Sequence, residues 1–365
     1  MSAVVTCALL FNLSAPVDLP AGSEPGAFGF QQIETSKNVS QLLRSNADHI
    51  WSYNRDSSVL KDLIRYVEPS GTISGDPHLG NMSVIPVQSK RGRGALRFVN
   101  VDFDDGGKGP FALEFARFVL VAKGSSKEIR AKDLFKAYFA GLRGEQMAKP
   151  ESIARAEAIS MEQYETMRQA YVAKKVFNGK FKYKAGEVER WDGRPNVDDI
   201  KDLFKGSTIL DIAKRPLDRG GSLDAGERLW VLTQDRAGAQ HITELKPYVD
   251  TSLSEYTRQA DPKERVNDLH DTYWPGLNGK AYDLVEAYGK TYWIREKKVE
   301  VLSYKDHAEE NEARIYIAYL IGQTQGQQAE GPRLLKLIEK DPERFKEAVK
   351  TYVKTYLGLA NSAME

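Results

Sequence analysis

Apolar residues between positions 34 and 66 recur at steps of three and four, which is the period of a helix that buries one face. A Pro-Ser-Gly stretch at 69–71 would end this segment, because proline and glycine interrupt regular structure. Residues 82–88 and 95–101 are strand-like, and the basic, glycine-containing segment 90–94 separates them. The pattern therefore predicts a helical segment followed by a β-hairpin.

The pattern after residue 110 is helical as far as about residue 175. The apolar positions that we expect in the core of this stretch are Phe115, Phe118, Val119, Leu134, Tyr138 and Leu142. A strand-rich block follows at about 209–304, and residues 307–357 have the pattern of two long helices. This order of helices, hairpin, helices, strands and helices predicts an α+β fold.

The composition is that of a folded globular chain. Hydrophobic residues make up 41% and charged residues 28% of 365 residues, enough for two domains or two lobes. The net charge of +1 provides no overall field that would attract nucleic acid or anionic lipid. The chain has one cysteine, Cys7, which excludes an internal disulfide.

Residues 2–15 are almost wholly apolar or small, and the first charged residue is Asp18. This run has the length of a signal-peptide core, and Leu13-Ser14-Ala15 would suit a cleavage site, but the usual preceding positive charges are missing. The sequence leaves open a signal peptide, a buried first strand or a flexible N-terminus for residues 1–27. No later segment has the roughly 20 consecutive apolar residues of a membrane span.

Residues 74–81 read Ser-Gly-Asp-Pro-His-Leu-Gly-Asn, so Asp76 and Asn81 are five positions apart. Protein kinases use this spacing between a carboxylate that accepts the proton of the attacking hydroxyl and an asparagine that binds magnesium. His78 lies between them and would either orient Asp76 or be an ordinary loop histidine. We therefore expect Asp76, with His78, at the catalytic position.

The predicted hairpin begins directly after Asn81 and ends directly before Asp102. The start of one antiparallel strand lies beside the end of its partner, so these two residues should be neighbours. An amide oxygen and a carboxylate can share a Mg²⁺ ion whose other ligands are phosphate oxygens and water. Asp104 is the candidate for a second metal ligand or a supporting one.

A glycine-rich stretch separates two predicted strands, 209–217 and 228–234. Glycines there would let backbone N–H groups approach the phosphates of ATP closely. The residues that would cover the phosphates are Gly220, Gly221, Ser222 and Gly226. A third predicted strand ends in Lys246, which would pair with the α- and β-phosphates. A carboxylate on the next helix usually steadies such a lysine, and Glu255 and Glu264 are the candidates, Glu264 at the more familiar distance.

These motifs resemble those of a bacterial family known as domain of unknown function 2252. The matching stretches are Gly75 to Asn81, Asn100 to Pro110, Gly221 to Leu229, Thr243 to Lys246 and Tyr292 to Arg295. The resemblance spans about residues 40–330. It implies a two-lobed protein-kinase-like fold in circularly permuted order, similar in its site to aminoglycoside and choline phosphotransferases.

The lobes implied by this resemblance are a helical catalytic lobe at 28–205 and an antiparallel-sheet nucleotide lobe at 206–305. The C-terminal helices, 306–365, would pack on the catalytic lobe. The sequence departs from the family pattern at four positions, which bear on nucleotide affinity more than on metal binding. Asp224 replaces a glycine, Pro247 a glutamate and Glu114 an aspartate, while Val101 separates Asn100 from Asp102.

We therefore expect a phosphotransferase that uses ATP and Mg²⁺ and acts on a hydroxyl of a small molecule or a protein. A pseudokinase that binds nucleotide to regulate a partner stays open because of Asp224 and Pro247. A metal-dependent phosphoester hydrolase would use Asp76, His78, Asp102 and Asp104 without requiring ATP. No nucleic-acid partner and no transmembrane segment are expected. The ATP requirement favours the cytoplasm, whereas a genuine export signal would argue against a kinase role.

Overall fold

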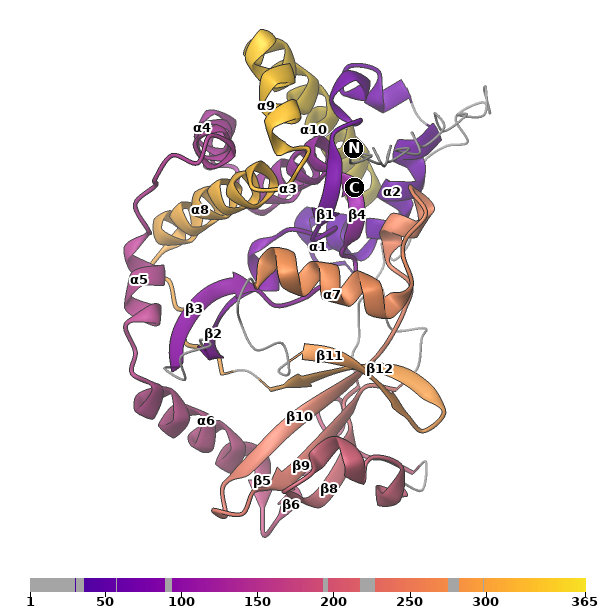
Figure 1. The fold of residues 1–365 in the computed structure, drawn as a ribbon, viewed down its shortest axis with the longest axis vertical. Helices are drawn as coiled ribbons and strands as arrows, with labels where there is room; N and C mark the ends of the chain where they lie inside the picture. Colours follow the sequence, from indigo (N-terminus) through magenta and orange to yellow (C-terminus); the bar gives the residue numbers. More distant parts are fainter. Residues whose placement is uncertain are drawn as a thin grey trace, which may run out of the picture.

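The computed structural model describes residue 30 and residues 36–56, 58–88, 94–192, 196–216, 227–274, 282–297 and 299–365. Within them the chain is α+β, with most helices gathered at one end and an antiparallel sheet at the other (Figure 1). The possible leader at 1–27 and the expected phosphate-covering residues Gly220, Gly221, Ser222 and Gly226 lie outside the described residues.

The larger sheet has six antiparallel strands in the order β11-β12-β10-β9-β8-β7. Its strands are β7 (Glu189–Arg190), β8 (Thr208–Lys214), β9 (Leu229–Gln234), β10 (Gln240–Pro247), β11 (Tyr282–Ala287) and β12 (Lys290–Glu296). Successive side chains of a strand point to opposite faces, so the apolar alternation gives the sheet two packed faces. The strands predicted at 209–217 and 228–234 and the strand predicted to end in Lys246 are confirmed as β8, β9 and β10, with β8 ending at Lys214.

The two faces of this sheet have different neighbours. Trp230, Leu232 and Ile242 lie on the face that packs against α6 (Met161–Lys175) and the short strands β5 (Val176–Phe177) and β6 (Lys180–Phe181). Leu229 and Leu245 pack on the opposite face. Lys246 lies directly opposite Trp293 in the ladder, and Trp293 packs on Phe103 and on α7 (Pro262–Tyr273). Lys246 therefore points toward the part of the chain that carries the predicted catalytic loop.

Helix α3 (Phe111–Ser125) is the centre of the helical part. Every side chain from Phe111 to Ala122 is buried, which explains why this segment is apolar on all sides. The surrounding helices are α1 (Val39–Ser45), α2 (Ala47–Asp56), α4 (Ala131–Leu142), α5 (Glu151–Glu157), α8 (His307–Gly326), α9 (Gly331–Lys340) and α10 (Pro342–Met364). The six expected core positions between Phe115 and Leu142 are all buried, so that prediction is confirmed.

One helical expectation is confirmed and another needs correction. The segment 34–66 forms the short helices α1 and α2, followed by 3₁₀ turns at Ser58–Leu60 and Ile64–Tyr66. The last segment forms three helices instead of two. Asp341 caps α10 by accepting the backbone N–H of Arg344, and Pro342 occupies the first turn, where its missing N–H costs no helical hydrogen bond.

Two small antiparallel ladders position the predicted site. Strands β2 (Met82–Gln88) and β3 (Gly94–Asn100) form the expected hairpin, with Met82 opposite Asn100. Strands β1 (Ser70–Ile73) and β4 (Gly107–Pro110) form the second ladder, with Ile73 opposite Gly107. The loop 74–81 and the loop 101–106 each join one ladder to the other, so the two loops lie side by side. In the described part of the chain, no helix is long and apolar enough to span a membrane.

Candidate functional site

A buried glutamate on α3 holds the loop 74–81 in place through hydrogen bonds. Glu114 accepts hydrogen bonds from the backbone N–H of Ser74 at 2.6 Å and from its hydroxyl at 2.8 Å. Gln325 of α8 donates to the other Glu114 oxygen at 2.7 Å. Burial raises the pKa of Glu114, and the hydrogen bonds from Ser74 and Gln325 act in the opposite direction. Glu114 therefore has a structural role in holding this loop.

Gly75 lets the two loops touch. Its φ of +76° lies in the left-handed region, and a Cβ there would be 1.7 Å from the carbonyl oxygen of Asp105. The Gly75 carbonyl accepts a hydrogen bond from the Trp51 indole at 3.2 Å. A glycine is thus required immediately before Asp76, because any side chain would push the two loops apart.

Asp76 is buried and held by two basic side chains. Arg117 of α3 donates to Oδ1 at 2.6 Å, and His78 Nε2 lies 3.3 Å from Oδ2. Burial alone would raise the pKa of Asp76, but the charges and hydrogen bonds of Arg117 and His78 outweigh it and hold this pKa well below its usual value. Asp76 is consequently ionised and oriented, which suits positioning a hydroxyl better than removing its proton at neutral pH.

Asn81 and Asp102 are brought together as the hairpin predicted. The Val101 N–H donates to the Asn81 carbonyl at 2.8 Å, which places Asp102 directly beyond this contact. The Asn81 side-chain nitrogen donates to the Asp76 carbonyl at 2.9 Å. The amide oxygen is therefore the Asn81 atom that could bind a cation. Asp102 has a side chain that is 28% exposed, so one carboxylate at this position is accessible to a ligand.

Lys246 reaches this pair from the other end of the chain. Its ammonium group lies 3.4 Å from Asp102 Oδ1 and makes a direct ion pair with Asp104. Lys246 is 5% exposed. Burial lowers its pKa, and the Asp102 carboxylate acts in the opposite direction. A lysine of the late sheet and the two acidic residues of the early loop therefore occupy one site.

Glu264 does not take the role expected of it. It is exposed in the first turn of α7, as is Glu255 in the turn before that helix, and no contact between either residue and Lys246 occurs in the described part of the chain. The next residue, Arg265, points inward and donates to the carbonyl of Asp104 at 3.0 Å and to that of Gly106. The phase of α7 thus presents an arginine to the acidic loop, and Asp102 and Asp104 replace the glutamate as partners of Lys246.

A charged network on the same face of the sheet joins two stretches that the motifs marked separately, Thr243 to Lys246 and Tyr292 to Arg295. Glu244 is 2% exposed and accepts hydrogen bonds from Arg295 at 2.7 Å and from the Trp230 indole at 3.1 Å. Burial would raise its pKa, but Arg295, Arg228 and Lys297 outweigh burial and lower it to about 2. Arg295 also lies 3.8 Å from Asp102, so the network is continuous with the lysine site. The alternation of Glu244 with Lys246 along one strand was the signal available in the sequence.

The described residues on either side of the expected phosphate loop are held together. Lys214 of β8 lies opposite Leu229 of β9, and the Arg215 N–H donates to the Arg228 carbonyl at 2.8 Å. Arg215, Arg228 and Lys297 lie close to one another near these described residues. The mutual proximity of these cations contributes to the lowered pKa of Lys297, whose first cause is burial. The surroundings of the loop favour an anionic ligand.

The donor set fits magnesium better than a transition metal. Asn81, Asp102 and Asp104 offer oxygen ligands, and Mg²⁺ is commonly held by one or two carboxylates together with substrate phosphates. No cluster of three or more histidine, cysteine, aspartate or glutamate side chains suited to a metal occurs among the residues that the structure describes. A cation at this position would compete with Lys246 for both carboxylates.

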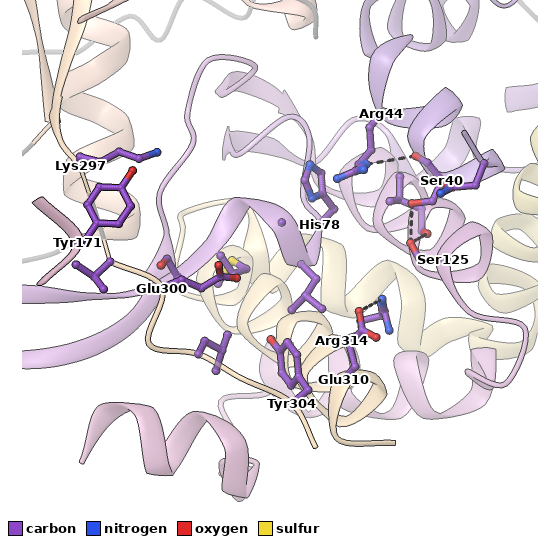
Figure 2. Close-up of a pocket in the computed structure, with 18 of the residues that line it drawn as sticks. Ser40, Arg44, His78, Ser125, Tyr171, Lys297, Glu300, Tyr304, Glu310 and Arg314 are labelled. Carbon is purple, nitrogen blue, oxygen red and sulfur yellow. Dashed lines mark hydrogen bonds and ion pairs between the residues drawn. The ribbon is translucent and has the colours of Figure 1, made fainter. Parts of the chain in front are cut away.

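A cavity of about 1110 Å³ opens beside the catalytic loop. His78 and Gly80 border it on the loop side, and Figure 2 shows Lys297 and Tyr171 at one end and Arg44 near His78 at the other. His78 lines the cavity, whereas Asp76 does not. Comparison of the chain with family models, with curated proteins and with solved structures gives no match.

Proposed function

We propose that this chain is a magnesium- and ATP-dependent phosphotransferase with kinase-like lobes in circularly permuted order. The observation that carries the proposal is the contact of Lys246 with Asp102, 144 positions earlier in the sequence, and with Asp104. Burying a lysine with two carboxylates costs free energy because both kinds of charge lose hydration. Such a grouping is more typical of a functional site than of a packed core. The residues are those that phosphoryl transfer requires, since it relies on positioning and on neutralising charge.

Each residue has a role in this proposal. Lys246 pairs with the phosphates once Asp102 and Asp104 turn to the cation. The Asn81 oxygen and Asp102 hold magnesium, which when bound neutralises phosphate charge during the transfer. Arg295 lies near both Asp102 and Glu244 and restrains the orientation of the Asp102 carboxylate. The loop 220–226 would cover the phosphates, as its glycines suggest.

The acceptor would be bound on the His78 side. Both oxygens of Asp76 are engaged, one by Arg117 and one by His78, and the imidazole is the member of this group that borders the cavity. An acceptor hydroxyl therefore meets His78 first. Asp76 fixes the ring through Nε2, as a carboxylate orients a histidine in other catalytic pairs, and stabilises the imidazolium that forms when the ring accepts the proton.

A nucleotide-binding regulatory module without turnover is the second candidate. It is favoured by the contact of Lys246 with both acidic residues, since a lysine held on the metal carboxylates competes with the cation. The absence of a glutamate partner from α7, within the described ranges, points the same way. The two candidates differ in one measurable quantity, which is the release of ADP.

The test is a thermal-shift titration with MgATP on wild type, Asp102→Asn and Lys246→Ala. We expect stabilisation of the wild type and its loss in both variants. Asp202→Asn and Lys205→Ala are the matched controls, because these residues form an ion pair of the same types at 3.8 Å with side chains about 80% exposed. A wild-type protein that MgATP does not stabilise would refute nucleotide binding. An ADP-release assay, with Asp76→Asn as the inactive control, then separates turnover from binding alone.

A further inference from the structure

The cavity beside the catalytic loop is predominantly basic. Its charged side chains in the described part of the chain are Arg44, Lys174, Lys297, Arg314, Glu300 and Glu310, four cations and two carboxylates. Glu310 is already engaged, because it accepts a hydrogen bond from Arg314 at 2.7 Å. Lys297 also faces the buried Glu244. Two cations, Arg44 and Lys174, and one carboxylate, Glu300, remain, so the cavity as a whole would attract an anion.

Arg44 is the cation nearest the catalytic loop. It is half-buried in the last turn of α1, and its Nε donates to the Ser40 carbonyl at 3.4 Å. No acidic residue lies within ion-pair distance of it among the residues that the structure describes. Arg314, on another wall of the cavity, forms an ion pair with Glu310 (Figure 2). The charge of Arg314 is therefore balanced, whereas that of Arg44 is not balanced by a described acidic residue. A half-buried guanidinium without a counterion is a ready site for a carboxylate or phosphate.

The side chains of Arg44 and His78 both lie next to Gly80. A Cβ added to Gly80 would lie 2.9 Å from the His78 ring and 3.3 Å from Arg44 Nη1. If Arg44 binds an anionic group, the rest of the same molecule would therefore lie against His78. The other side of the His78 ring contacts Asp76. The hydroxyls of Ser40 and Ser125, 2.7 Å apart on the same wall, add hydrogen-bonding capacity for a polar ligand.

We infer that the acceptor is a hydroxylated molecule with an acidic group, and that Arg44 binds this group and so turns the hydroxyl toward His78. This inference rests on the proposed phosphotransferase function. Its chemistry is shared by hydroxycarboxylates and by phosphorylated polyols. A cavity of about 1110 Å³ accommodates either.

The experiment is isothermal titration calorimetry of the nucleotide-free full chain with three probes on one carbon skeleton: glycerol 3-phosphate, glycerate and glycerol. Wild type is compared with Arg44→Ala and Arg44→Lys. Arg65→Ala is the matched control, because Arg65 is exposed and outside the cavity, so it removes the same charge elsewhere. We expect the wild type and Arg65→Ala to bind an anionic probe and not glycerol. Arg44→Ala should weaken that binding by about tenfold or more, the usual loss for a charge-assisted pair.

Arg44→Lys should recover part of the affinity, which separates loss of charge from loss of folding. The inference is overturned if glycerol binds as well as the anions, if Arg44→Ala binds like wild type, or if wild type binds neither anion. It is also overturned if the anion is lost in Lys246→Ala instead, since it then occupies the nucleotide side. The MgATP titration is independent: anion binding at Arg44 without any effect of MgATP would reject the phosphotransferase and leave an anion site.

Discussion

The buried pair of Arg117 and Asp76 offers the sharpest test of how the site is built. The two side chains are 2.6 Å apart, and Arg117 is fully buried. Removing one member of a buried ion pair strands the other charge in a medium of low polarity and costs about 3–5 kcal/mol. Arg117 also has two nitrogens, Nε and Nη1, with no partner among the described residues, which already makes its burial expensive. We therefore expect Arg117→Met to lower the free energy of unfolding by about 3 kcal/mol, at the lower end of that range.

The double variant Asp76→Asn/Arg117→Met should be much less destabilised than the two single changes added together. Neither charge is then left alone, and an apolar side chain fills the space of the arginine. We expect the sum of the single effects to exceed the double by about 2–4 kcal/mol. Urea unfolding of the four proteins at pH 7 measures these quantities.

Arg130 and Asp133 provide the control cycle. Their atoms are also 2.6 Å apart, but the arginine side chain is 66% exposed, so the coupling should be below about 0.5 kcal/mol. The pH dependence adds a second readout. The folded-state pKa of Asp76 is depressed, so its stabilisation is complete above the unfolded pKa of about 4 and is lost as the pH falls below it. Arg117→Met should flatten this acid dependence. A coupling no larger than that of the exposed pair would refute the reasoning.

Three further outcomes follow from the same structure. Glu244→Gln should destabilise the protein by about 3 kcal/mol at pH 7, because it removes the buried carboxylate that accepts the hydrogen bond of Arg295. Because the folded pKa of Glu244 is about 2, this contribution is lost as the pH falls from about 4.5 toward 2, so the variant and wild type should converge there in urea midpoint. Gly322→Ala would place a Cβ 2.2 Å from the Tyr138 carbonyl where α4 and α8 cross, and should destabilise the protein by about 3 kcal/mol. Gly358→Ala, with nothing within 4 Å of the added Cβ in the described chain, should stabilise α10 by about 0.5–1 kcal/mol. Unchanged thermal midpoints in both variants would contradict this packing. His78→Gln should lower ADP release by about 10²-fold or more while MgATP still stabilises the protein, and full activity would remove His78 from the mechanism.

Local sequence was sufficient for the early half of the candidate site. Antiparallel pairing follows from alternation and a turn, so the hairpin at 82–100 could be read from neighbouring residues alone. That pairing forces Asn81 next to Asp102, whatever the rest of the chain does. The glycine before Asp76 belongs to the same short motif, and its left-handed φ explains the choice of residue. The boundary between α9 and α10 is also marked in the sequence. Asp341-Pro342 is a helix-start signal, which hydrophobic periodicity by itself does not show.

Only the tertiary structure decided which charges face one another. Arg117 is 41 positions from Asp76 on a helix that is apolar on every side, so no local pattern marks it as the partner of the carboxylate. Glu264 and Arg265 are adjacent in sequence, yet a rotation of about 100° per residue around α7 turns one to solvent and the other to the acidic loop. Ion pairs between distant segments depend on helix phase and sheet packing, which are set by the whole core and not by spacing along the chain.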